Sequence, residues 1–85
     1  MPHVQGKVHV DGSEFSVIAG AEVRILQKDK VVVKVFCDRQ GVFFARVLTN
    51  GPFMGEVVAR GFQTKRHPLV VGASVNIGLT RGAPA

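Results

Sequence analysis

Apolar and polar residues alternate with a period of two along most of this chain, and this alternation constrains the fold more than any other feature. In residues 4–10, valine or glycine occupies every second position, and Gln5, Lys7 and His9 lie between them. Successive side chains of a β-strand point to opposite faces, so such a segment can bury one face. Valine, which dominates the apolar residues, is β-branched and favours strands. Since no segment has a helical period, the chain is predicted to be all-β.

Turn-forming residues separate the alternating segments. Glycine, asparagine and aspartate cluster at residues 11–13, 38–41 and 49–52, and a polar turn occupies 28–30. These signals predict an antiparallel or mixed β-sandwich of about seven short strands. The expected strands cover residues 4–10, 21–25, 31–37, 42–48 and 53–60, with one or two more between 69 and 79. Residues 14–20 are expected to be irregular, with Phe15, Val17 and Ile18 folded inward, and residues 63–68 to form a polar connection.

Three residues are expected to have specific roles in the backbone. Gly6 lacks a side chain in the middle of a strand, so it can let another strand or an aromatic ring lie close. In the turn at 38–41, the side chain of Asp38 can accept hydrogen bonds from backbone amides, and Gly41 can adopt a positive φ.

The length of 85 residues is sufficient for one domain and too short for two. We expect a single domain over residues 1–85, with a core from 4 to 79 and a flexible tail from 80 to 85. The first residues lack the charged and then apolar pattern of a signal region. We therefore expect a domain of a longer protein or a mature chain. No apolar run approaches the length of a membrane span, so membrane insertion is not expected.

The composition disfavours several kinds of binding. All six aromatic residues are phenylalanine, and the exposed Trp and Tyr typical of sugar-binding platforms are missing, so carbohydrate binding would depend on Phe36, Phe44 or Phe62. The formal net charge of +5 is spread along the chain. Nucleic-acid-binding domains usually carry a denser basic stripe with interleaved aromatics, so nucleic-acid binding is disfavoured. A modest basic patch, interpreted as solvated surface, would consist of Arg60, Lys65, Arg66, His67 and Arg81.

Adjacent apolar residues predict an apolar surface outside the core. Phe43 and Phe44 cannot both point inward on a regular strand, and neither can Val35 and Phe36. An apolar outer face usually marks a docking surface for a partner domain or a sister subunit. The candidate docking face consists of Val32, Phe36, Phe44, Met54 and Val58. Lys28, Lys30 and Lys34 are expected to protect an exposed sheet edge from strand-to-strand aggregation.

Five short motifs occur in the order found in carboxypeptidase-regulatory-like domains, and the chain resembles this family from about Val4 to Leu79. The resemblance implies a prealbumin-like, immunoglobulin-like Greek-key sandwich, as in transthyretin. It also implies a non-catalytic accessory role in a larger, often secreted or envelope-associated protein. The motifs specify a fold and carry no chemistry. The matching residues are Gly6 and Val8, Gly20-Ala21-Glu22-Val23, Asp38-Arg39-Gln40-Gly41-Val42-Phe43, Asn50-Gly51-Pro52-Phe53 and Ala59-Arg60-Gly61-Phe62, followed by a last strand at Val75-Asn76-Ile77-Gly78-Leu79.

Hydrolysis and metal binding are disfavoured by the residues present. The transthyretin-related hydroxyisourate hydrolases use two His and an Arg and end in a Tyr-Arg-Gly-Ser motif. Here His9 resembles their first His motif only faintly, and the chain contains no Tyr. His3, His9 and His67 lack the spacing of a recognised ligand set. Cys37 is the only cysteine, so no internal disulfide is possible, and it is expected to be a small, partly buried apolar residue without a redox partner.

A Lys–Asn isopeptide bond, as in the similarly shaped collagen-adhesin B-type domains, would involve Lys7, Asn76 and Glu56. The alternation predicts that all three point outward, whereas the bond requires a buried trio.

These observations favour a non-catalytic module that contacts another protein or a neighbouring domain and uses no cofactor. One alternative is a carbohydrate-associated module of a degradative enzyme, and the other is a self-assembling structural subunit that forms homo-oligomers. An extracytoplasmic location is implied by the family resemblance alone.

Overall fold

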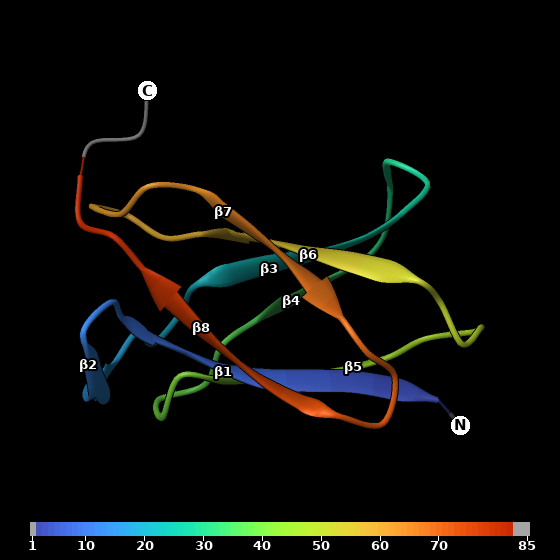
Figure 1. The fold of residues 1–85 in the computed structure, drawn as a ribbon, viewed down its shortest axis with the longest axis horizontal. Helices are drawn as coiled ribbons and strands as arrows, with labels where there is room; N and C mark the ends of the chain where they lie inside the picture. Colours follow the sequence, from blue (N-terminus) through green and yellow to red (C-terminus); the bar gives the residue numbers. More distant parts are fainter. Residues whose placement is uncertain (1, 83–85) are drawn as a thin grey trace.

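The computed structural model describes residues 2–82, which form eight strands in two facing sheets (Figure 1). The prediction of an all-β sandwich is confirmed. The strands are β1 (His3–Val10), β2 (Ser13–Val17), β3 (Glu22–Gln27), β4 (Lys30–Phe36), β5 (Val42–Arg46), β6 (Phe53–Val58), β7 (Lys65–Leu69) and β8 (Ser74–Leu79).

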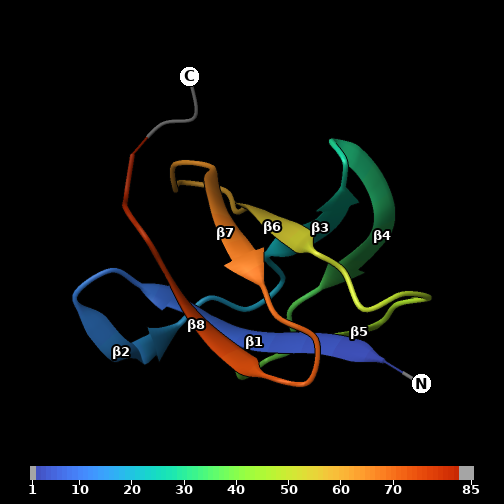
Figure 2. The same cartoon turned by 45° about the vertical axis from the view of Figure 1, so that its right-hand side comes forward.

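One sheet is built around β1, and the other has the order β4-β3-β6-β7 (Figure 2). In the first sheet, β5 pairs with residues 3–7 of β1 and β2 with its last two residues, both antiparallel. β8 pairs with residues 5–10 of β1 in parallel. Every other strand pair is antiparallel among the described residues. The first and last strands of the sandwich therefore lie side by side and run in the same direction.

Two of the eight strands lie where the sequence analysis expected none. β2 falls in the segment expected to be irregular, and β7 begins inside the expected polar connection. Only Leu69 of β7 is fully buried, so this strand has almost no apolar pattern to reveal it. Its position depends on antiparallel pairing with β6, which satisfies the main chain without burying most side chains.

The core lies between the sheets and contains the inward residues that the alternation predicts. Val4 and Val8 of β1, Val23 and Ile25 of β3, and Val57 of β6 are almost completely buried. Phe43 is the largest side chain in this group, and its neighbour Phe44 is half exposed on the other side of β5. The core further contains Ile18, Ala21, Cys37, Ala45, Val47, Phe53, Ala59, Leu69, Ile77 and Leu79.

Phe15 is the clear exception to the expected core. Its side chain is 97% exposed, although the sequence analysis placed it inside. β2 belongs to the sheet built around β1 and joins it only at the end of β1, at His9 and Val10. Ile18, three residues later, is buried as expected.

Gly6 lies where two neighbours approach β1 closely, as predicted. A Cβ on Gly6 would lie 2.6 Å from the carbonyl oxygen of Val75 and 2.8 Å from Cε1 of Phe43. Contacts under 3.0 Å are closer than a carbon atom tolerates, so glycine at this position lets β8 and the Phe43 ring pack against β1.

The turn between β4 and β5 also has the predicted geometry. Oδ1 of Asp38 accepts hydrogen bonds from the backbone N–H groups of Gln40, at 2.9 Å, and Val42, at 3.0 Å. Gly41 has a φ of 75°. Because β4 and β5 belong to different sheets, this turn carries the chain from one sheet to the other.

Candidate docking surface

The five residues of the predicted docking face do not share one surface. Val32 and Phe36 of β4 and Met54 and Val58 of β6 belong to the β4-β3-β6-β7 sheet, whereas Phe44 of β5 belongs to the sheet built around β1. Phe36 and Phe44 were expected on one face because they are close in the chain and both point away from the core. The turn at residues 37–41 places them on opposite sheets, so the expected single face is two.

The outer face of the β4-β3-β6-β7 sheet carries three rows of side chains that cross the strands. Register partners project to the same side of a sheet, and alternate residues along a strand share that side. Apolar residues predominate in the two outer rows, and the middle row is charged. The rows are Phe36–Glu22–Val58, Lys34–Arg24–Glu56–Arg66 and Val31–Leu26–Met54–Pro68.

The charged row is held together by ion pairs. The Arg24 guanidinium contacts the carboxylate of Glu22 and that of Glu56, the latter at 3.2 Å, and Arg66 donates to Glu56 at 3.0 Å. The hydrogen bond to Glu22 and the charges of Glu22 and Glu56 raise the pKa of Arg24 above its ordinary value. Arg24 therefore stays charged, and the row forms a fixed polar stripe between two apolar ones.

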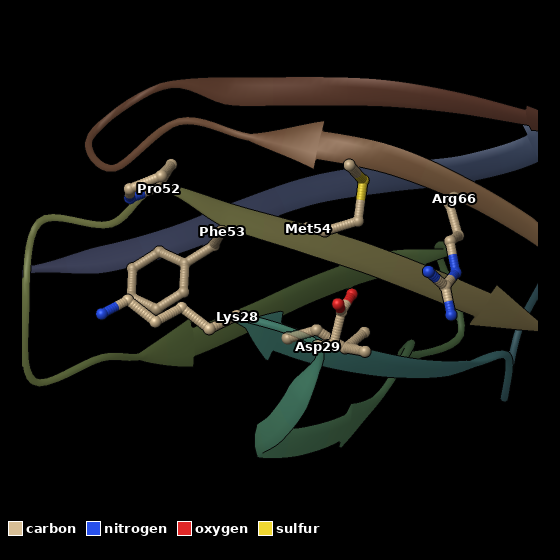
Figure 3. Close-up of a pocket in the computed structure, with 7 residues that line it drawn as sticks. Lys28, Asp29, Pro52, Phe53, Met54 and Arg66 are labelled. Atoms are coloured by element: carbon tan, nitrogen blue, oxygen red, sulfur yellow. The ribbon is translucent and has the colours of Figure 1, made fainter.

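A hollow of about 200 Å³ opens on this face beside the third row (Figure 3). Leu26 and Met54 form its apolar part together with Pro52 and Phe53, and Lys28, Asp29 and Arg66 contribute the charged groups. Lys28 and Asp29 form the β3–β4 turn with φ values of 51° and 64°. This turn was predicted from the sequence, but the hollow was not. Its lining comes from β3, β6 and β7, and the sequence does not show that these strands are neighbours.

A second hollow of about 200 Å³ lies beside Val32, where β4 faces the loop after β5. Val32 is the extra residue of a β-bulge, since Ile25 pairs with Val33 and Leu26 with Val31. Val33, Leu48 and Phe53 supply most of the remaining apolar lining. Val32 therefore lies at the edge of its sheet, apart from the three rows of the outer face.

The residues of the candidate basic patch lie on several sides of the molecule. Lys65, Arg66 and His67 are consecutive on β7, so their side chains alternate between its two faces. Arg66 pairs with Glu56 on the outer face, whereas Lys65 reaches across to β8 and donates to the carbonyl oxygen of Gly78 at 3.0 Å. Nδ1 of His67 lies 2.7 Å from the carbonyl oxygen of Pro68.

The two arginines of the patch lie away from β7. The Arg81 guanidinium lies 5.3 Å from the centre of the Phe62 ring, a cation–π contact, and Arg60 is exposed after β6. The structure thus does not gather the five residues into one dense stripe.

The other groups considered for chemistry are dispersed as well. Lys7 and Asn76 are register partners on the outer side of one sheet, whereas Glu56 lies in the other sheet, paired with two arginines. Burial raises the pKa of the Cys37 thiol to about 11, with a smaller contribution from Asp38. Among residues 2–82, no group of three or more His, Cys, Asp or Glu side chains is arranged to hold a metal ion. The same residues contain no helix with the length and apolar character that a membrane crossing requires.

Comparisons with known proteins identify the fold and no family. No family model and no curated protein matches the chain. The structure is similar to a chain in the crystal structure of a type II cohesin–X-dockerin complex from Acetivibrio cellulolyticus, a C-terminal interface mutant, with a TM-score of 0.63 and 18% sequence identity. The match covers 99% of this chain and 56% of that chain. At this identity the likeness shows a shared β-sandwich, and the resemblance to carboxypeptidase-regulatory-like domains stays a prediction.

Proposed function

We propose that this chain is a non-catalytic β-sandwich module that docks on another protein domain through the outer face of the β4-β3-β6-β7 sheet. The observation that carries the proposal is the exposure of large apolar side chains in both outer rows of that face. Phe36 is 59% exposed in one row, and Val31 is 54% and Met54 37% exposed in the other. Apolar patches bordered by polar residues are typical of protein interaction sites.

The arrangement of the face indicates the chemistry of the partner. The hollow beside Leu26 and Met54 fits one apolar side chain, and Phe36 and Val58 offer a second apolar contact across the charged row. Lys28 and Lys34 have no ion-pair partner among the side chains that the structure describes. A partner domain with an exposed aliphatic or aromatic residue flanked by carboxylates would complement both features.

The comparison with solved structures supports a role in protein recognition. The similar chain belongs to a cohesin–X-dockerin complex, which is an assembly of proteins. We extend this role to the present chain as part of the proposal. The family resemblance adds a location outside the cytoplasm, which cell fractionation with an antibody to this chain would test.

Paired baits test the proposed face. Wild-type chain, Phe36→Asp and Phe44→Asp are immobilised and exposed to an extract of the source organism. The two variants carry the same exchange at half-exposed phenylalanines on opposite sheets. We expect a protein from the extract to be retained by the wild-type and Phe44→Asp baits and not by the Phe36→Asp bait.

The retained protein is then purified, and its affinity is measured by isothermal titration. We expect its dissociation constant to rise at least about tenfold with Phe36→Asp, as for a contact near the centre of an interface. Equal affinity for folded Phe36→Asp and wild type, or no protein retained by the wild type, would rule out docking through this face.

A further inference from the structure

Among residues 2–82, five strands of the sandwich have an unpaired edge, and these edges are protected to different degrees. β4 and β7 border one sheet. In the other, β8 lies along one side of β1, and β5 and β2 follow each other along the opposite side. An unpaired edge is a template for another strand, and proteins usually block it with lysine, proline, a bulge or a very short strand.

The edges of four of the five strands are blocked or irregular. β4 has Lys30, Lys34 and the bulge at Val32. β7 contains Lys65 and Pro68, and Lys65 also covers β8 by donating to Gly78. β2 pairs with β1 at only two positions, with a register shift between them.

β5 has none of these devices. It contains neither lysine nor proline, and it pairs with β1 over all five residues without a register shift. The one charged residue of β5, Arg46, lies at its end. β5 is therefore a regular strand whose outer edge is available for pairing beyond Val42, which is bonded to Asp38.

The hydrogen-bond pattern shows which backbone groups of β5 point to that edge. Val8 donates to the carbonyl of Gly41, and Val47 donates to the carbonyl of Pro2. These bonds mark the hydrogen-bonded pairs of the β1–β5 ladder, and such pairs recur at every second residue of an antiparallel ladder. Phe43 and Ala45 therefore direct their N–H and C=O groups toward β1, whereas Phe44 and Arg46 direct theirs away from it.

The side chains on the outer face of β5 are apolar around Phe44. Phe44 is 50% exposed, and Val42 is also exposed on the same side. The His3 ring stacks on the Phe44 ring, with centroids 5.0 Å apart and planes at 25°. Phe44 is thus partly held in place before any partner binds.

We propose that β5 pairs with the β5 strand of a second copy of this chain, antiparallel and centred on Phe44. In this register the two Phe44 residues exchange both main-chain hydrogen bonds, and their rings meet on the outer face. Arg46 of each copy lies opposite Val42 of the other, so no like charges face each other. The two sheets join into one continuous sheet across the pair of molecules.

In this register each β5 strand offers the other the same hydrogen-bonding groups and the same apolar side chains. For that reason we assign a second copy of this chain as the partner of β5. Val42 uses its N–H and C=O on Asp38, so it leaves only its second acceptor site for an arriving strand. An interface centred on two main-chain hydrogen bonds is small, and micromolar affinity is expected. The proposal concerns a different sheet from the proposed docking face, so either can fail without the other.

Sedimentation equilibrium from low micromolar to millimolar concentration tests the pairing. We expect the wild type to form dimers reversibly, Phe44→Lys to stay monomeric, and Phe36→Lys to dimerise as the wild type does. Far-UV circular dichroism checks that each variant is folded. A wild type that is monomeric up to millimolar concentration overturns the proposal, and so does a dimer that Phe36→Lys abolishes and folded Phe44→Lys retains.

Cysteine cross-linking tests the register and does not require Phe44→Lys to fold. In a Cys37→Ala background, Phe44→Cys should link to itself under mild oxidation, because partners in such a ladder lie within disulfide range. Val42→Cys alone and Arg46→Cys alone should link slowly, and a mixture of the two should link fast. Fast self-linking of Val42→Cys, or no link with Phe44→Cys, would overturn the proposed register.

Discussion

Gly6 and Phe43 are in contact on the inner side of β1, and the contact leaves no room for a methyl group on Gly6. The register pairs the two residues across β1 and β5. The Phe43 ring fills the space that a side chain on Gly6 would occupy, and the main chain of β8 lies equally close from the other side of β1. The largest fully buried side chain thus depends on a glycine of the neighbouring strand.

We expect Gly6→Ala to lower the free energy of unfolding by at least about 2 kcal/mol, because the added carbon meets a backbone oxygen that cannot rotate away. Urea denaturation followed by circular dichroism measures the loss. Gly78→Ala is the matched control, since a Cβ there meets its nearest neighbours only at 3.2 Å. Gly78→Ala should lower the free energy of unfolding by less than half as much as Gly6→Ala. Equal decreases for the two variants would contradict the steric explanation.

The turn at 38–41 should lose stability when its carboxylate is removed. Asp38→Ala leaves the N–H groups of Gln40 and Val42 without their acceptor, and we expect a cost of about 1–2 kcal/mol. Asp38→Asn keeps an oxygen at the same position and should recover at least half of the loss. If Asp38→Ala unfolds at the same urea concentration as the wild type, the side chain does not stabilise this turn.

The stability of the wild type should fall in alkaline solution because of Cys37. The pKa of this thiol is raised from 9.0 to about 11 in the folded chain. Between these values the folded chain keeps the proton and the unfolded chain releases it, so the free energy of unfolding decreases as the pH rises. Below pH 9 the Cys37 thiol is protonated in both the folded and the unfolded chain, and ionisation of Cys37 no longer lowers the free energy of unfolding.

Denaturation curves of wild type and Cys37→Ala between pH 8 and about 11 isolate this effect, since both chains contain the same lysines. The wild type should lose stability more steeply than the variant. Slow alkylation of the native thiol by iodoacetamide at pH 8 is expected for the same reason. If the free energy of unfolding falls equally with pH for wild type and Cys37→Ala, the Cys37 thiol has the same pKa in the folded and the unfolded chain.

Removing the charge of Glu56 should make stability less dependent on salt. Glu56 joins Arg24 and Arg66, and all three groups are reached by solvent, so their attraction is screened by ions. We expect Glu56→Gln to destabilise the chain slightly at low ionic strength and to approach the wild type in concentrated salt. Lys34→Gln removes a charge from the same row that has no ion-pair partner among the described side chains, and it should show no such dependence.

The alternation of residues was sufficient to predict which side chains of a strand share a face. Phe43 points inward and Phe44 outward, and Gly6 lies at a close approach, because these properties depend on neighbours along the chain. The turn at 38–41 was predicted for the same reason, since its hydrogen bonds join residues within five positions.

The arrangement of the two sheets was not predictable in the same way. Phe36 and Phe44 are eight residues apart, and only the long-range pairing of β4 with β3 and of β5 with β1 reveals that they lie on opposite sheets. The charged row and the hollow beside Met54 likewise join residues from three or four strands. β7 was missed because Lys-Arg-His-Pro contains no apolar alternation.

The parallel pairing of β1 with β8 has a mechanical consequence. His3 at the start of β1 and Leu79 at the end of β8 lie at opposite ends of two overlapping parallel strands, which pair over six positions (Figure 1). A force that separates these two residues slides one strand along the other and loads all six positions together, whereas a force across a hairpin opens its hydrogen bonds one after another. A chain stretched along this line should therefore resist tension far better than its modest size suggests.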